Sequence, residues 1–433
     1  MNRIMAKLQR FGRIRQLHTI ISQETIKPSS PTPPHLKSYN LSLVDHLAPN
    51  IHMPLIFFYQ NYNNRDIIVL KKSLSECLTQ YYPFAGRLLT PSAPDIECKD
   101  HGVEFLEASI DYRLHDFILN KEQDETLDKL IPNELGMATN KTSPNMVEVQ
   151  LNHFTCGGVA LAVAISHKVA DAFTMANFIN HWASVARGGS PINPNFLAHS
   201  LSNHKLPEFT FRGAFEVKQY ATRRFVFPDS KLNELKNKVN ESSTTPVNPT
   251  RVESLTSLIY KCAVGAAATT KSGSFKTSIL SQAVNMRKKL GPNFPKLAAG
   301  NIITEAITKT MDSSQIKLNE VITNLRKEIT ALPGVRNVEE VGKVWGKKVL
   351  MLRNDQSPYY NFTSICRLPF YQVDFGWGKP SQVMLHTTKA KGNLIVLMES
   401  PSGDGIEATV HLEKEDMDLF QKDKELLAYV EDI

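Results

Sequence analysis

One continuous stretch near the middle of the sequence constrains the fold most, because two apolar runs and an amphipathic segment follow one another without a break. The run "VEVQLNHF" at 147–154 alternates apolar and polar residues, as a strand with one buried face does. After a Gly-Gly pair that predicts a turn, "VALAVAIS" at 159–166 is continuously apolar until its last residue, as a fully buried strand is. Residues 171–186 then carry apolar side chains at helical spacing. The sequence therefore predicts strand, turn, strand and helix, with His167 closing the second strand and Asp171 opening the helix.

A chain of 433 residues is too long for one ordinary hydrophobic core, so two domains of roughly 200 residues each are expected. Residues 191–221 are rich in Pro, Asn and Ser and have no periodicity, which predicts a crossover linker. We therefore expect an α/β protein with an N-terminal domain at 25–190 and a C-terminal domain at 222–433. A basic extension at 1–24 precedes them.

Mixed strand and helix patterns occur in both halves, and we see no short internal repeat. Further strands are predicted at 55–59, 102–110, 222–227, 278–287, 393–400 and 406–413, with another that ends in the glycine-rich turn of 371–380. Further helices are predicted at 66–82, 228–239, 251–269 and 319–332, with Thr250 as the N-cap of the third.

The net charge of +7 is unevenly distributed, because residues 1–23 contain five basic residues and no acid. The rest of the chain carries only about +2, which gives no support for nucleic-acid binding. The longest apolar runs are too short to span a bilayer. The Arg-rich start resembles a transit peptide but is poor in serine, so we expect a solvated extension, with organelle targeting as the alternative.

The five cysteines are scattered, with no C-x-x-C pair, and no secretory signal is visible. This favours a reducing compartment, with a cytoplasmic protein that has unpaired thiols and no disulfide scaffold. A zinc site needs a third ligand near His167, and the only nearby histidines, His153 and His181, do not have zinc spacing. We therefore expect no metal.

His167 and Asp171 are the leading candidates for chemistry. A neutral imidazole at the end of a strand can take a proton near pH 7, and a carboxylate one helical turn later could orient it. Asp171 could instead pair with a distant arginine and hold the loop, because a buried carboxylate needs a partner. An ordinary buried core histidine is the alternative that spacing alone leaves open.

A second unusual stretch, "DFGWGKP", surrounds a tryptophan with two glycines, which allows tight backbone curvature beside a large ring. A strand-edge turn is its simplest interpretation. A kinase is excluded because no H-R-D loop precedes it. The G-x-S-x-G elbow of serine hydrolases and the common phosphate-binding loops are also absent from the sequence. The residues of the motif are Asp374, Phe375, Gly376, Trp377 and Gly378.

Together, "HKVAD" at 167–171 and "DFGWG" at 374–378 resemble the two signatures of the plant acyl-CoA-dependent acyltransferases called the BAHD family. They lie about 200 residues apart, as the family has them. The segments "YYPFAGRL", "AVNMR", "SGDGIEA" and the Gly-Asn pair at 300–301 match as well, so the resemblance covers nearly all of 25–433. Within the family, the chain is most similar to the alkaloid acetyltransferase branch.

The resemblance implies two similar-sized, mixed-sheet domains like those of chloramphenicol acetyltransferase, joined by a long crossover, with a channel between them. His167 would lie in that channel and deprotonate the acceptor hydroxyl, with acyl-CoA and acceptor entering from opposite faces and no acyl-enzyme. Asp171 would turn away and pair with Arg287 of "AVNMR", which is a structural role. "DFGWG" would support the channel and its CoA side.

One position departs from the family pattern. The family commonly has T-S-W-C-R before its last signature, and this chain has isoleucine at the tryptophan position, Ile365. An isoleucine cannot donate a hydrogen bond to a developing oxyanion, and the loss of one such donor costs ~10² or more in rate. Thr363, Ser364 and Arg367 remain candidate contacts for donor or acceptor.

The expected function is therefore transfer of an acyl group, most simply acetyl from acetyl-CoA, to a hydroxyl of a plant specialised metabolite. A monoterpenoid indole alkaloid is the leading acceptor, and phenolic or terpenoid alcohols stay open. The alternatives are a non-catalytic or weakly catalytic alkaloid-binding protein, which Ile365 would favour, and a thioesterase. The resemblance implies a monomer with acyl-CoA as co-substrate and no permanently bound cofactor.

Overall fold

The computed structural model describes residues 18–63, 66–119, 127–134, 143–197, 219–241, 247–271, 275–352, 355–387, 390 and 392–431. Most of the predicted extension and crossover, residues 1–17 and 198–218, lies outside these described residues. Within them, no helix combines the length and the apolar character that a membrane span requires.

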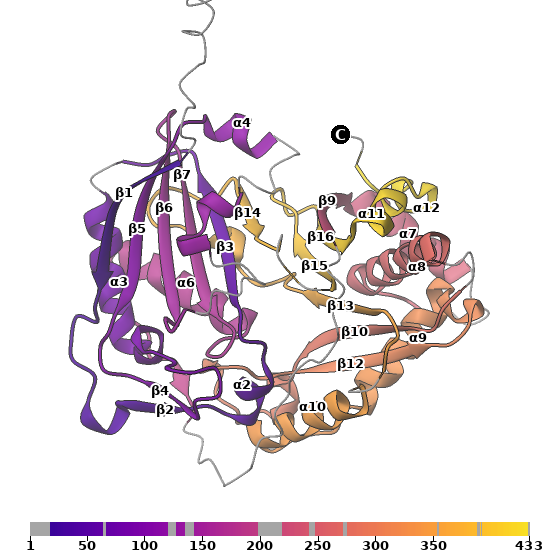
Figure 1. Ribbon diagram of the computed structural model, residues 1–433, viewed down its shortest axis with the longest axis horizontal. Helices are drawn as coiled ribbons and strands as arrows, with labels where there is room; N and C mark the ends of the chain where they lie inside the picture. The colour runs from indigo at the N-terminus through magenta and orange to yellow at the C-terminus, as the bar shows by residue number, and fades with distance from the viewer. Residues whose placement is uncertain are drawn as a thin grey trace, which may run out of the picture.

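The first sheet has six strands in the order β1-β5-β6-β7-β3-β14 and occupies the left of Figure 1. Its strands are β1 (His18–Ile26), β3 (His52–Tyr59), β5 (Val103–Ile110), β6 (Val147–Phe154), β7 (Val159–Ser166) and β14 (Gln382–Leu385). Helices α3 (Asp66–Gln80) and α6 (Ala172–Ala186) pack on one face and form the larger core with it. The short helix α4 (Leu114–Leu119) and the turn η3 (Asp128–Leu130) cover part of the other face.

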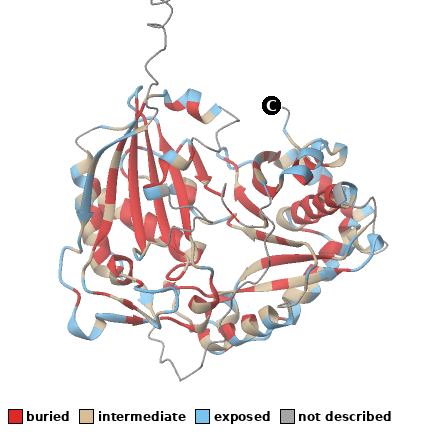
Figure 2. Cartoon of the chain, viewed as in Figure 1, coloured by how far each residue is buried: buried red, intermediate tan, exposed pale blue. Residues whose placement is uncertain are grey.

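The second sheet also has six strands, in the order β12-β10-β13-β15-β16-β9. Its strands are β9 (Tyr220–Pro228), β10 (Ser278–Asn285), β12 (Ile303–Thr310), β13 (Tyr359–Ser364), β15 (Asn393–Glu399) and β16 (Gly405–Glu413). The helices that share its main core are α7 (Asp229–Glu241), α8 (Arg251–Lys271), α9 (Leu318–Ala331), α11 (Lys414–Phe420) and α12 (Lys424–Leu427). Burial is concentrated in the central strands of both sheets and in the helix faces against them (Figure 2).

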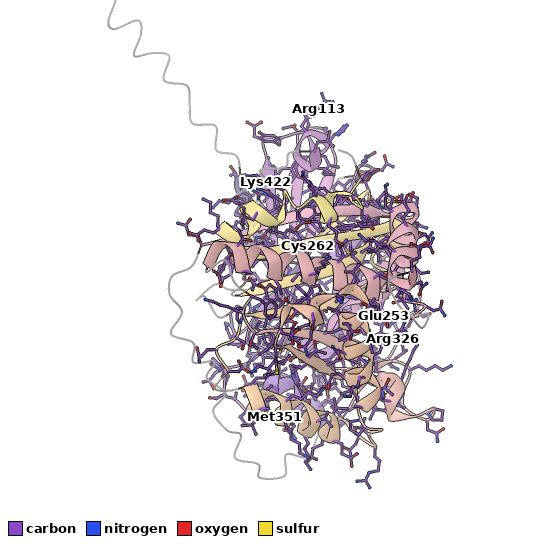
Figure 3. All side chains as sticks on the ribbon, turned by 90° about the vertical axis from the view of Figure 1, so that its right-hand side faces the viewer. Arg113, Glu253, Cys262, Arg326, Met351 and Lys422 are labelled. Atoms are coloured by element: carbon purple, nitrogen blue, oxygen red, sulfur yellow. The ribbon has the colours of Figure 1, made fainter. Side chains whose placement is uncertain are left out.

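The start of α8 confirms the predicted cap. Thr250 Oγ1 accepts from the backbone N–H of Glu253 at 3.2 Å, and Glu253 Oε2 accepts from the N–H of Thr250 at 2.8 Å, which is a capping box. Arg326 of α9 also donates to Glu253, at 2.6 Å, so one carboxylate both caps α8 and joins the two helices. Figure 3 labels Glu253 and Arg326 as neighbours on this side of the molecule.

The two halves of the chain interlock at three places. Strand β14 comes from the second half yet pairs antiparallel with β3 of the first sheet, as Leu385 opposite Leu55 illustrates. Helix α2 (Leu43–Leu47) of the first half packs against α10 (Val338–Leu352) of the second in a separate apolar cluster (Figure 1). The two-residue strands β8 (Asn195–Phe196) and β11 (Ala298–Ala299) pair in parallel. A second two-stranded sheet, within the first half, joins β2 (Ser38–Asn40) to β4 (Asp95–Glu97).

The expected α/β architecture of two mixed-sheet halves is confirmed, but the predicted boundaries were too simple. Residues 18–24, assigned to the extension, form part of β1 and pair with β5. Residues 370–385, assigned to the second domain, join the first sheet and its core. Edge strand β1 has no residue that is fully buried, so its sequence carries little apolar alternation. The location of β14 depends on a partner strand more than 300 residues away.

The central block was predicted correctly as β6, a turn, β7 and α6. The prediction of a strand just before the glycine-rich turn was wrong, because these residues form the 3₁₀ helix η7 (Phe370–Gln372). Strand β12 and helix α10 were not predicted. Helix α10 buries Val338, Val341 and Trp345, a helical spacing that the sequence does contain.

Candidate active site

The loop between β7 and α6 presents His167 at the edge of the first sheet. Strand β7 is fully buried, and it ends at Ser166. The N–H of His167 then donates to the carbonyl of Ile51, just before β3, at 2.9 Å. This bond continues the pairing of β3 with β7 by one residue and fixes the backbone from which the imidazole projects.

Asp171 closes the same loop, and its carboxylate binds groups other than His167. It is the N-cap of α6 and accepts from the N–H of Thr174 at 2.9 Å. Arg287, in the 3₁₀ helix η5 (Arg287–Leu290), donates to both carboxylate oxygens at 2.6 and 3.1 Å. Burial raises the pKa of the Asp171 carboxyl, but the charge of Arg287 and the bonds from Arg287, Thr174 and Ile302 outweigh it and lower that pKa. The structure thus brings together the pair that the resemblance implied.

The His167 side chain is held by Asn301, which comes from the second half of the chain. Nδ1 of His167 lies 3.1 Å from Oδ1 of Asn301. The amide nitrogen of Asn301 donates to His167 O at 2.7 Å and to Asp45 Oδ1 at 2.8 Å. Both of those partners only accept, so the amide oxygen must face the imidazole and Nδ1 must carry the proton. Nε2 therefore keeps its lone pair.

Nε2 of His167 has no hydrogen-bond partner among the described residues. It is also not one of their buried side-chain atoms that lack a partner, so it is accessible to solvent. The residue as a whole is partly exposed. Burial is the main cause that lowers the pKa of His167, while Asp171 and Asn301 act in the opposite direction. A lowered pKa keeps the imidazole neutral near pH 7, which is the form that accepts a proton.

Asp45 anchors this arrangement. It is 1% exposed and belongs to the capping box of α2, in which Oδ2 accepts from the N–H and hydroxyl of Ser42 at 2.8 and 2.7 Å. Its other oxygen accepts from both the backbone and the side-chain nitrogen of Asn301. The imidazole is thus oriented by an amide of one half and a carboxylate of the other.

Comparisons with known proteins show the family of this chain. A family model described as the Transferase family matches residues 18–427. The chain belongs to this family, the BAHD acyltransferases. Members of the BAHD family use acyl-CoA as co-substrate, so this chain is an acyl-CoA-dependent acyltransferase.

Curated relatives cover almost the whole acyltransferase. Akuammiline synthase 1 from Alstonia scholaris is 39% identical over 94% of this chain and 97% of its own length. Stemmadenine O-acetyltransferase from Catharanthus roseus is 34% identical over 93% of this chain and 96% of its own. The crystal structure of vinorine synthase covers 96% of this chain and 98% of its own with a TM-score of 0.81 at 31% identity.

A more distant structure, F. graminearum TRI101 complexed with coenzyme A and T-2 mycotoxin, covers 91% of this chain and 99% of its own. Its TM-score is 0.74 at 15% identity, which shows the shared fold alone.

The second BAHD signature forms a packed corner far from His167. Oδ1 of Asp374 accepts from the N–H groups of Gly376 and Gly378 at 2.7 and 2.9 Å, and both glycines have positive φ, 100° and 84°. The Trp377 ring packs edge-on against Tyr59 at 5.2 Å. Tyr59 is the last residue of β3, whereas His167 bonds to Ile51, just before the first residue of β3. The length of this strand therefore separates Trp377 from His167 by roughly 25 Å.

Phe375 is buried between neighbouring rings, with Trp182 at 4.9 Å and Tyr59 at 6.4 Å between ring centroids. The motif therefore joins the segment before β14 to the core of the first sheet. Among the described residues, no hydrogen bond or ring contact joins this corner to residues 167–171, the candidate catalytic loop.

Ile365, which stands where the family commonly has tryptophan, is part of the larger core. Ile365 is 5% exposed and belongs to the core that also holds Trp377, and its N–H donates to Leu397 at 2.8 Å. Thr363 and Ser364 are partly exposed at the end of β13, and Arg367 is exposed with a φ of 67°. The structure places none of these three in hydrogen-bond contact with the described residues of the catalytic loop.

Asn301 and Asp45 are the functional residues that sequence reasoning missed. Asn301 was noted only as part of a matching Gly-Asn pair, and Asp45 had no role. The capping-box spacing of Ser42 and Asp45 would have predicted a helix start, but not a bond to a residue 256 positions away. Among the described residues, no cluster of three or more metal-ligating side chains is present.

Proposed function

We propose that the protein transfers an acetyl group from acetyl-CoA to a hydroxyl group of a monoterpenoid indole alkaloid, with His167 as the general base. The observation that carries this proposal is the fixed tautomer of His167, whose Nδ1–H is bound by Asn301 while Nε2 is left with a free lone pair. A base of this kind needs an uncharged nitrogen that points at the proton it removes.

The proposed reaction is direct. Nε2 takes the proton of the acceptor hydroxyl as its oxygen attacks the thioester carbonyl carbon. The C–S bond then breaks, and the leaving CoA sulfur takes the proton back from the imidazolium. Throughout, the Nδ1–H bond to Asn301 keeps the ring in place, so catalysis rests on proton transfer and positioning of the two substrates, and no acyl-enzyme forms.

Asp171 has an architectural role in this proposal. Both of its oxygens are occupied by Arg287, by the N–H of Thr174 and by the N–H of Ile302. Such a carboxylate neither touches the imidazole nor accepts its proton. It holds the start of α6 against the second half of the molecule, and the loop that carries His167 is held with it.

Similarity to stemmadenine O-acetyltransferase supports acetyl as the donor group and an indole alkaloid as the acceptor. Other relatives have different names, including an N-malonyltransferase from Strychnos nux-vomica that is 34% identical over 95% of this chain and 90% of its own length. The donor and the acceptor therefore need a direct test.

The test incubates the purified protein with acetyl-CoA and a panel of hydroxylated alkaloids, and follows both CoA release and the acetylated product by mass spectrometry. We expect product only with acceptor present, and none with His167→Ala. CoA release without an alcohol would indicate a thioesterase. Thermal stabilisation by an alkaloid without any product would indicate a binding protein on this scaffold.

We further propose that the protein acts as a monomer in the cytoplasm. The five cysteines are free, three of them buried, which fits a reducing compartment. Light scattering of the purified protein and the location of a fluorescent fusion in plant cells test the two parts of this proposal separately.

A further inference from the structure

Lys168, the residue after His167, is buried and makes contacts that the proposed reaction does not explain. It is 5% exposed, and lysine side chains are seldom buried to this degree. Its Nζ donates to the backbone carbonyls of His46 at 2.9 Å and Asp45 at 3.3 Å. These carbonyls lie in the last turn of α2, where backbone acceptors have no partner within the helix.

The same short helix also carries the carboxylate that orients the catalytic imidazole. The side chain of Lys168 donates to backbone carbonyls of α2. Asp45 of α2 accepts from the amide nitrogen of Asn301, and the amide oxygen of Asn301 accepts from His167. Because His167 and Lys168 are neighbours in the chain, these contacts form a closed ring. A shift of α2 relative to the catalytic loop would therefore break bonds at two places in the ring.

The charge of the Lys168 ammonium acts on His167 in the same direction as burial, which is the main cause that lowers the pKa of His167. Asp171 is the negative charge on the same loop, and Arg287 forms a two-point ion pair with it. Asp171 acts on His167 in the opposite direction to Lys168, and Arg287 pairs with Asp171. Asp45 and His46 lie beside Lys168. Burial lowers the pKa of Lys168 to about 8, although Asp45 opposes this, so the side chain remains mostly protonated at pH 7.

We propose that Lys168 is a positioning residue that holds α2 against the catalytic loop and, through its charge, adds to burial in favouring the neutral form of His167. This inference rests on the proposed role of His167 as the base. Its contribution has two separable parts, because the two carbonyl bonds need only a donor of the right length, whereas the effect on His167 needs the positive charge.

The decisive experiment measures the ionisation of His167 itself and needs no acceptor. Protein labelled with ¹⁵N-histidine is titrated by NMR, and His167→Ala assigns the signal. In Lys168→Met we expect the pKa of His167 to rise by about 0.5–1 unit, because a neighbouring positive charge disfavours the imidazolium. In Lys168→Arg, which keeps the charge, we expect the pKa of His167 to stay within about 0.2 unit of its value in the unmodified protein.

The chain offers a matched control. Nζ of Lys289 donates to the carbonyls of Leu332 at 2.9 Å and Ile329 at 3.4 Å, at the end of α9, in the same arrangement as Lys168 on α2. Lys289→Met removes an equivalent clamp from another helix, so it should lower the melting temperature without moving the pKa of His167.

Activity gives the second measurement, once an acetylated alkaloid is identified. The acidic limb of the kcat/KM profile should move to higher pH in Lys168→Met and be restored in Lys168→Arg. An unchanged pKa of His167 in Lys168→Met overturns the proposal and leaves Lys168 as a packing residue. If Lys168→Met does not fold, Lys168→Gln replaces it. Because the NMR titration does not depend on turnover, failure of this inference is distinguishable from failure of His167 as the base.

Discussion

At the residue scale, the proposed chemistry depends on the side-chain amide of Asn301, whose orientation is fixed by its hydrogen-bond partners. Asn301 can place its oxygen toward His167 only because its nitrogen is bound to Asp45 and to the carbonyl of His167. A proton on Nδ1 and a free Nε2 follow from that orientation without any contact to Asp171. The aspartate of the H-x-x-x-D motif and the carboxylate that supports the base are therefore two different residues.

The first prediction concerns His167. Replacing it by alanine removes the only group that we assign to proton transfer, so transfer should fall by at least ~10²–10⁴-fold. His167 is partly exposed, and among the described residues its ring makes one hydrogen bond, from Nδ1 to Asn301, so the melting temperature should change little. Steady-state rates and a thermal melt on the same preparation check both parts. Near-normal turnover in the variant would remove the mechanism.

The second prediction concerns Asn301. Asn301→Ala takes away the acceptor for Nδ1–H and leaves the imidazole free to rotate and to change tautomer. Loss of such a supporting contact typically costs about 10–100-fold in activity. We expect kcat to fall within this range, with a smaller effect on KM, and the ¹⁵N signals of His167 to lose the pattern of a single tautomer. A variant with unchanged ¹⁵N signals would contradict the assignment.

At the element scale, a buried ion pair joins the start of α6 to the second half of the molecule. Asp171→Ala leaves Arg287 charged and buried without its partner, and breaking such a pair costs about 3–5 kcal/mol. We expect a large loss of stability or of soluble yield. The double variant Asp171→Ala with Arg287→Met should lose less than Asp171→Ala alone, because no unpaired charge remains. Chemical denaturation of Asp171→Ala, Arg287→Met and the double variant, compared with the parent protein, measures this coupling.

The same pair predicts a pH dependence of stability. The pKa of Asp171 is lowered in the folded protein, so its contribution is fully present above the unfolded value of about 3.9. That contribution is lost as pH falls from there through the lower pKa of the folded state. The free energy of unfolding of the parent protein should therefore decline more steeply below about pH 4 than that of the double variant. Equal slopes would show that Asp171 is not the group involved.

Also at the element scale, substitutions in the D-F-G-W-G corner should lower the stability of the fold more than they lower kcat. Trp377→Ala removes a ring that packs on Tyr59 and Tyr62, and loss of a buried tryptophan typically costs about 3–5 kcal/mol. Below the melting temperature of the variant, kcat should stay within a few-fold of the parent value. A large rise in KM for acetyl-CoA in a stably folded variant would instead indicate a direct role in CoA binding.

The elements also show what sequence reasoning can reach. Strands β6 and β7 and helix α6 were predictable because each has a local pattern of its own: alternation in β6, a continuous apolar run in β7 and helical spacing in α6. Family motifs were sufficient to predict His167, Asp171 and Arg287. Asn301 and Asp45 were not, because their bond joins residues 256 positions apart and neither lies in an unusual local pattern. The addition of β14 to the first sheet is equally non-local, since pairing partners are decided by the whole fold.

At the scale of the whole molecule, the two halves are similar in design but not independent. The core of the first sheet includes residues from β15 and from the segment 365–383 of the second half. The cluster between α2 and α10 draws Val44 from one half and Trp345 from the other. Apolar burial is the main driving force of folding, so cores that share residues from both halves should form together.

The last prediction follows from this sharing. Calorimetry of the intact protein should give one cooperative unfolding transition, with the two halves melting together, although a chain of this length with two sheets could in principle show two. Trp345→Ala tests the coupling directly, because the residue is 6% exposed in the cluster that supports α2, the helix that carries Asp45. We expect it to lower the single melting temperature and also to reduce kcat, although Trp345 itself is remote in sequence from every catalytic contact. Two resolved transitions, only one of them shifted by Trp345→Ala, would mean that each sheet folds by itself and that the active site is assembled by docking of finished halves.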